Sequence, residues 1–99
     1  MKVNALLMDE KDNVATCVEE VQAGQEITYS REGKLCTIIA GETIPYCHKI
    51  ALERIEAGQM AVKYGEQIGK ASEAIEQGRW VSHHNIFSIP RDYESEYIR

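Results

Sequence analysis

Positive charge is what this sequence of 99 residues most clearly lacks. It has 11 Lys and Arg against 16 Asp and Glu, which gives a formal net charge of −5 at pH 7. A protein that binds the phosphate backbone of a nucleic acid needs a surplus of basic side chains. The charge balance therefore argues against a nucleic-acid partner.

Long apolar runs are also missing. No stretch approaches the roughly 20 apolar residues that a membrane-spanning helix needs. The opening segment, MKVNALLMDEKDN, has no apolar core followed by a cleavage site, as a secretion signal would have. We expect a cytoplasmic protein that does not interact with a membrane.

Cysteines are few, odd in number and far apart: Cys17, Cys36 and Cys47. This pattern fits neither a disulfide framework nor a zinc site built on a CxxC pair. We expect reduced and mostly buried thiols. Cys47 differs from the others because it directly precedes His48.

Aromatic residues make up only 7% of the chain, and the single Trp lies in residues 78–86, GRWVSHHNI. Neutral imidazoles bind metals and transfer protons near pH 7. Adjacent residues of a strand point to opposite faces, so His83 and His84 can serve one site only if the strand has ended. The pair is therefore a weak indication of a metal site.

A short pattern occurs three times, at residues 17–24, 51–58 and 71–78. In each copy a small residue precedes a β-branched residue by four positions, and a glycine follows three positions later. The four-residue spacing predicts one helical turn, which the glycine ends, and an apolar run follows each copy. The uneven spacing of the copies excludes a solenoid. We expect a mainly β fold in which short one-turn helices lead into short strands.

Other segments support this fold class. Residues 3–8, 27–30 and 35–40 are strand-like, and residues 31–34 are typical of a hairpin turn. Residues 48–55 fit either a strand or a two-turn helix.

Two glycines, Gly65 and Gly69, interrupt a strand pattern, which is typical of a bulge or of a close backbone approach. They do not form a phosphate loop, because the Lys-Ser/Thr ending is absent.

Three motifs then stand in a specific order: residues 44–52 (IPYCHKIAL), 62–69 (VKYGEQIG) and 78–85 (GRWVSHHN), with DNVA at 12–15. Together they resemble the small SAF-type (β-clip) domain at the amino terminus of the altronate/galactarate dehydratase family. The resemblance covers about residues 3–87, which we expect to be one domain, followed by a polar tail at 88–99.

The sequence departs from that family at two places. Cys47 stands where the family usually has a glycine before its His-Lys pair. Ser82 stands where the family has the first histidine of its His-x-His-Asn motif, and His83 fills the variable position. His84 and Asn85 match the motif.

The resemblance implies the small subunit of a sugar-acid dehydratase, inactive alone, which forms 2-keto-3-deoxy acids together with a large dehydratase subunit. The assembled enzyme is expected to use a divalent metal, typically iron, which this chain does not necessarily bind. The implied catalytic residues are His48 and His84. The implied substrate-binding residues are Asn85, Lys49 and His83.

Several alternatives stay open at this stage. Related two-subunit enzymes release sulfite from sulfolactate, so the chain could be the small subunit of such a sulfo-lyase. It could also be a non-catalytic module that binds carbohydrates or carboxylates, or a free-standing metal-binding protein. Self-association into a homo-oligomer is a further alternative.

Overall fold

The computed structural model describes residues 2–87, so the predicted tail at 88–99 lies outside the described residues. Residues 2–87 contain nine strands and no helix, and thus no helix that could cross a membrane. The strands are β1 (Ala5–Leu6), β2 (Val14–Cys17), β3 (Glu26–Arg31), β4 (Lys34–Ile39), β5 (Lys49–Ala51), β6 (Met60–Lys63), β7 (Glu66–Ala71), β8 (Trp80–Val81) and β9 (Ile86–Phe87). The expectation of a mainly β fold is confirmed.

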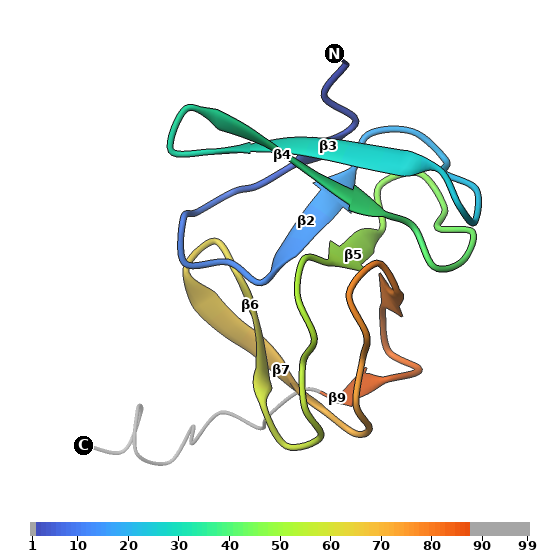
Figure 1. The fold of residues 1–99 in the computed structure, drawn as a ribbon. Helices are drawn as coiled ribbons and strands as arrows, with labels where there is room; N and C mark the ends of the chain where they lie inside the picture. The colour runs from blue at the N-terminus through green and yellow to red at the C-terminus, as the bar shows by residue number, and fades with distance from the viewer. Residues whose placement is uncertain (1, 88–99) are drawn as a thin grey trace.

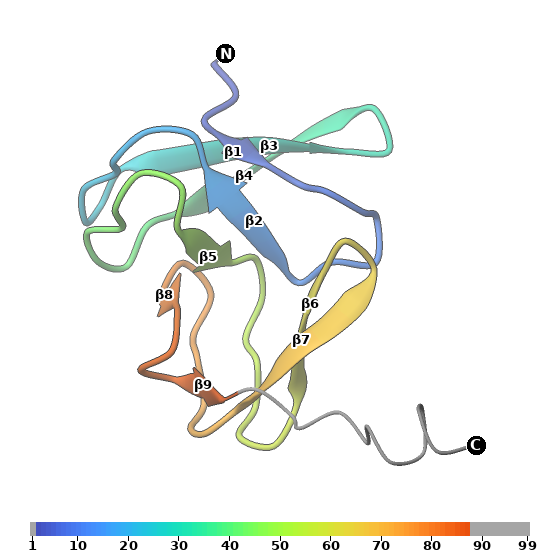
Figure 2. The ribbon, with the colours of Figure 1, turned by 180° about the vertical axis from the view of Figure 1, so that it is seen from behind.

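A four-stranded antiparallel sheet in the order β1-β2-β5-β8 joins two hairpin units. The hairpin β3–β4 leaves this sheet after β2 and returns to β5, and it crosses the upper part of the molecule in Figure 1. The hairpin β6–β7 leaves after β5 and returns to β8, with β9 added at its edge. In Figure 2, seen from behind, β5 lies below the β3–β4 hairpin, and β8 lies next to β5 on the left.

The central sheet is buried on both faces, which gives the protein two apolar clusters. Ala15 and Ile50, paired across β2 and β5, pack with side chains of the β3–β4 hairpin. Val14 and Ala51, the neighbouring pair, pack with side chains of the β6–β7 hairpin. This division follows from the two-residue period of a strand, which sends successive side chains to opposite faces.

The predicted one-turn helices are wrong. The β-branched residues of the repeat form isolated antiparallel bridges, in which Val21 pairs with Ile44 and Ile55 pairs with Ile75. Each bridge closes the base of one hairpin unit with two reciprocal backbone hydrogen bonds of 2.7 to 3.0 Å. A single helical turn would fix several dihedral angles for one hydrogen bond, so the pairing between distant copies is the better solution.

The glycine of each copy lies in a tight turn. Gly24, Gly58 and Gly78 have φ angles of 87°, 88° and 88°, the left-handed region that favours glycine. Residues 40–47 form a fourth copy with Ile44 as its β-branched residue. The sequence pattern hides this copy because Cys47, with φ 69°, stands at the glycine position.

The hairpin predicted at residues 31–34 is confirmed, with Glu32 and Gly33 as its two loop residues. Tyr64 and Gly65 form the loop of the β6–β7 hairpin instead of interrupting a strand. Both loops have positive φ at both residues, the backbone that suits a two-residue hairpin.

Gly69 does mark a close approach. A Cβ atom at Gly69 would lie 2.9 Å from the carbonyl oxygen of Phe87 in the neighbouring strand β9. The helical alternative for residues 48–55 is wrong, because residues 49–51 form β5.

Candidate functional site

The strand pair β5–β8 brings His48 to the only tryptophan. Ile50 pairs with Trp80, and His48 lies just before β5. The Trp80 Nε1–H group donates a hydrogen bond to Nδ1 of His48 at 3.2 Å. The two rings meet edge to face, with centroids 5.3 Å apart. One specific contact thus joins two residues that are 32 positions apart in the sequence.

His84 reaches the same indole from the turn that follows β8. Its ring centroid lies 5.2 Å from that of Trp80, again in an edge-to-face arrangement. Nδ1 of His84 forms a short contact with the hydroxyl oxygen of Ser82. We call Trp80, His48, His84 and Ser82 the Trp80 cluster.

Asn85 holds the turn that presents His84. Its Oδ1 accepts a hydrogen bond from the Ser82 backbone N–H at 3.0 Å, and its Nδ2 donates to the Trp80 carbonyl at 2.7 Å. The residue is 5% exposed, and both ends of its amide bond to backbone groups. The geometry therefore gives Asn85 a role in shaping the turn, because those bonds fix residues 80–85 relative to one another.

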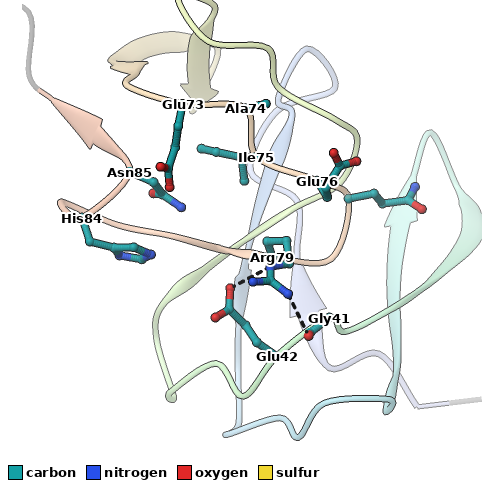
Figure 3. A pocket seen from close by; sticks show the side chains of 10 residues that line it. Gly41, Glu42, Glu73, Ala74, Ile75, Glu76, Arg79, His84 and Asn85 are labelled. Carbon is teal, nitrogen blue, oxygen red and sulfur yellow. Dashed lines mark hydrogen bonds and ion pairs between the residues drawn. The ribbon is translucent and has the colours of Figure 1, made fainter.

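An open groove of about 550 Å³ adjoins the cluster (Figure 3). His84 and Asn85 lie at one end of the groove and Glu76 at the other. The lining residues are Gly41, Glu42, Glu73, Ala74, Ile75, Glu76, Gln77, Arg79, His84 and Asn85. The groove thus lies between residues 41–42, which follow β4, and residues 73–77, which follow β7.

The charges of this groove are mainly negative. Three glutamates line it, and the Arg79 guanidinium is engaged by the Glu42 carboxylate at 3.3 Å and by the Gly41 carbonyl at 3.2 Å. Glu42 also accepts a hydrogen bond from the Trp80 backbone N–H at 2.9 Å. An anionic ligand at the groove would face carboxylate repulsion unless additional cations were supplied from elsewhere.

Lys49, predicted to bind substrate, is not part of the cluster. It pairs with Val81 and Thr16 on the face of the sheet opposite to Ile50 and Trp80. Burial, and then the nearby positive charge of Lys63, hold the pKa of the Lys49 ammonium below its usual range. His83, also predicted to bind substrate, is exposed in the same turn as His84.

The donor set of the described residues does not fit a metal centre. Within residues 2–87 no three His, Cys, Asp or Glu side chains converge as ligands would. Burial, and then the negative charge of Glu19, raise the pKa of the Cys17 thiol to about 11, so that this cysteine stays protonated near neutral pH.

Two members of the cluster were not identified as site residues in the sequence. Trp80 is the only tryptophan of the sequence, and a partly buried indole N–H normally requires an acceptor. Ser82 was interpreted as the loss of a histidine, yet its hydroxyl contacts the retained His84. The sequence could therefore indicate that the Trp80 N–H needs an acceptor. It could not identify His48 as that acceptor, because the contact depends on the pairing of β5 with β8.

Comparison of the sequence with known proteins identifies relatives of this chain. The (2R)-sulfolactate sulfo-lyase subunit alpha of Chromohalobacter salexigens is 29% identical over 89 residues, which cover 87% of this chain and 95% of the relative. The protein of the same name from Paracoccus pantotrophus is 42% identical over 48 residues, which cover 48% of this chain and 72% of the relative. Residues 3–88 match the family described as the altronate/galactarate dehydratase SAF domain, and the chain belongs to that family.

Proposed function

We propose that this chain is the small subunit of a lyase that acts on 2-hydroxy carboxylates and that requires a large catalytic subunit. The observation that carries the proposal is the Trp80 cluster, in which His48 and His84 pack on one indole beside an open groove. Membership of the SAF-domain family supports it, as does the similarity to a separate alpha subunit over 95% of that relative's length.

The two reactions named by these comparisons share one chemistry. Altronate and sulfolactate each carry a hydroxyl group at C2 and a leaving group at C3. A base removes the C2 proton, the electron pair of that bond forms the C2–C3 double bond, and the leaving group departs with the C3 bonding pair. The resulting enol becomes a 2-keto acid. The required groups are a base, an electrophile for the carboxylate and a proton or charge partner for the leaving group.

This chain supplies only part of that set. His48 and His84 are proposed to contact the substrate, and Asn85 to hold the turn that carries His84. The negative groove and the engaged Arg79 leave the recognition of an anionic substrate to cationic groups of the large subunit. The metal expected of the assembled enzyme is assigned to that subunit as well, since the described residues of this chain form no donor cluster.

Sulfite is the leaving group that we favour, because both curated relatives above are named as alpha subunits of sulfolactate sulfo-lyase. Water is the second candidate, as in the predicted sugar-acid dehydratase, because the family description names altronate and galactarate dehydratases.

The test is reconstitution of the full chain with a large subunit of this enzyme class. We expect sulfite and pyruvate from (2R)-sulfolactate only when both chains are present. Formation of 2-keto-3-deoxy acids from altronate or galactarate would establish the dehydratase instead. Equal activity of the large subunit alone would refute the proposal. Stoichiometric metal in the isolated chain would favour the metal-binding alternative.

Substitutions test the site in the same assay. His48→Ala and His84→Ala should each lower the reconstituted rate by about 100-fold, a typical contribution of a positioned acid, base or hydrogen-bond donor. Lys34→Ala, at the exposed start of β4, serves as the control and should leave the rate unchanged. If both histidine variants keep the full rate, the site assignment is wrong.

A further inference from the structure

We propose that Trp80 is a positioning residue that holds His48 in the tautomer with its proton on Nε2. His48 would then act as a hydrogen-bond donor toward an anionic oxygen and not as a general base. The use of His48 in catalysis rests on the proposed function, but the tautomer itself is a property of this chain.

The inference starts from the chemistry of the two rings. An indole Nε1–H group can only donate a hydrogen bond. It points at Nδ1 of His48, at a distance of 3.2 Å. The acceptor Nδ1 must therefore carry a lone pair, and in a neutral imidazole the single proton then resides on Nε2.

The geometry of the donor is fixed by independent contacts. The backbone N–H of Trp80 donates to Glu42 at 2.9 Å, and its carbonyl accepts from Asn85 at 2.7 Å. The indole packs against the apolar cluster under the β3–β4 hairpin. These contacts hold the indole in place, so that its N–H group keeps a constant direction.

The backbone of the acceptor residue is fixed as well. The backbone N–H of His48 donates to the Pro45 carbonyl at 3.1 Å, and the His48 carbonyl accepts from the Cys17 N–H at 2.9 Å. The backbone of His48 therefore lies at a defined place between the turn at Cys47 and β5. Fixed backbones on both sides make the Trp80–His48 hydrogen bond a structural constraint and not a chance surface contact.

His84 is under no such constraint. Its Nδ1 faces the Ser82 hydroxyl, which can either donate or accept a hydrogen bond. When the hydroxyl accepts, the Nε2 lone pair of His84 is available to take a proton. The cluster thus gives the two histidines different roles. His48 donates a hydrogen bond to the substrate or leaving-group oxygen, and His84 is able to remove the C2 proton.

The experiment is nitrogen NMR of the full chain with ¹⁵N-labelled histidine, at about pH 8.5, where an ordinary imidazole is neutral. Long-range ¹H–¹⁵N correlation should show Nδ1 of His48 without a proton and Nε2 with one. With uniform ¹⁵N labelling, a scalar coupling between Trp80 Nε1 and His48 Nδ1 should cross the hydrogen bond. A proton on Nδ1 of His48 in the wild-type chain would overturn the proposal.

Two variants complete the test. Trp80→Phe keeps an aromatic ring but removes the donor, so the His48 ¹⁵N signals should move toward the average of both tautomers. The ¹⁵N signals of His84, whose ring also contacts the indole, should change only by the much smaller ring-current effect. Ser82→Ala is the matched control and should affect His84 alone. Unchanged His48 signals in a folded Trp80→Phe chain would also overturn the proposal. If circular dichroism shows that this variant is unfolded, the coupling in the wild-type chain decides.

In the reconstituted enzyme, Trp80→Phe should lower the rate by about five- to tenfold, the effect of one lost orienting hydrogen bond. The tautomer is measured without any partner, so a failure of the lyase assay leaves it untouched. A confirmed tautomer with no lyase activity would refute the proposed function only.

Discussion

Cys47 is a non-glycine residue in a backbone conformation that favours glycine. It adopts φ 69° at a turn position where the other three copies of the repeat have glycine. A Cβ atom in the left-handed region costs about 1 kcal/mol or more. The thiol is exposed and free, so it gains little packing energy to offset this cost.

Cys47→Gly should therefore stabilise the protein by about 1 kcal/mol, equivalent to about 4–8 °C in Tm for a domain of this size. Gly58→Ala is the matched control, because a Cβ atom there would meet no other atom within 4 Å and would test the φ angle alone. It should lose about the same free energy of unfolding. Urea unfolding of both variants measures the two effects, and a destabilised Cys47→Gly would contradict the strain argument.

The thiols should also differ in reactivity. Near pH 8 a thiol reagent should label the exposed Cys47 first, whereas Cys17 should react only on unfolding, because it is buried and its pKa is raised to about 11. The raised pKa means that the folded state favours the protonated thiol. The contribution of the protonated Cys17 thiol to stability is complete below about pH 9, the pKa of this thiol in the unfolded chain. This contribution is lost as the pH rises to about 11, the pKa of the thiol in the folded protein.

The measurement is the free energy of unfolding between pH 8 and pH 11, compared with that of Cys17→Ala. The alanine variant loses packing at every pH but should show a shallower decline above pH 9. Parallel curves would show that Cys17 does not carry the effect.

At the scale of elements, one buried carboxylate holds the loop of the β6–β7 hairpin against an earlier segment of the chain. Asp12 is 2% exposed and accepts hydrogen bonds from the backbone N–H groups of Asp9, Tyr64 and Gly65 at 2.8 to 3.0 Å. Two of these donors form the hairpin loop. The loop conformation, with positive φ at both residues, therefore depends on a residue about 50 positions earlier.

Asp12→Ala should destabilise the fold by about 3 kcal/mol, because it leaves three backbone donors without their acceptor. Asp12→Asn should cost less, since one side-chain oxygen remains as an acceptor. Glu66→Gln, exposed in the same hairpin, is the control and should change stability by less than about 0.5 kcal/mol. Chemical denaturation measures all three, and equal stabilities of the Ala variant and the control would refute this role of Asp12.

The elements also show what sequence patterns can and cannot decide. The β3–β4 hairpin was predictable, because its strands are adjacent and its loop residues are typical of a tight turn. The repeat was visible, but its conformation was predicted wrongly. A spacing of four fits one helical turn, yet Val21 and Ile55 take partners 23 and 20 residues away. Pairing between such distant segments cannot be inferred from local spacing.

For the whole molecule, the candidate site belongs to the junction of the two hairpin units. His48 follows a turn of the first unit, and Trp80 and His84 come from the end of the second. Family motifs predict His48, His84 and Asn85 as site residues, and the structure places these three near Trp80. They did not indicate the Trp80–His48 hydrogen bond or the separation of Lys49 to the other face, because both depend on the register of β5 against β8.

Gly78 is the backbone position that joins the two units most tightly. Its N–H donates to the Ala51 carbonyl and its carbonyl accepts from the Gly41 N–H, both at 2.8 Å. A Cβ atom at Gly78 would lie 2.2 Å from the carbonyl oxygen of Ile39, in addition to the unfavourable φ of 88°. Relief of this overlap would require the first unit to move away from the turn that leads into β8.

Gly78→Ala should therefore destabilise the protein by about 3 kcal/mol or more, against about 1 kcal/mol for Gly58→Ala, which has the same φ but open space around it. The single tryptophan, two residues later, allows the junction itself to be observed. Its fluorescence should change in folded Gly78→Ala and stay constant in Gly58→Ala, because only the first substitution displaces Trp80 from His48. Equal losses of stability with identical fluorescence would show that the junction accommodates the Cβ atom without an energetic penalty. That result would contradict the rigid placement of the indole beside His48.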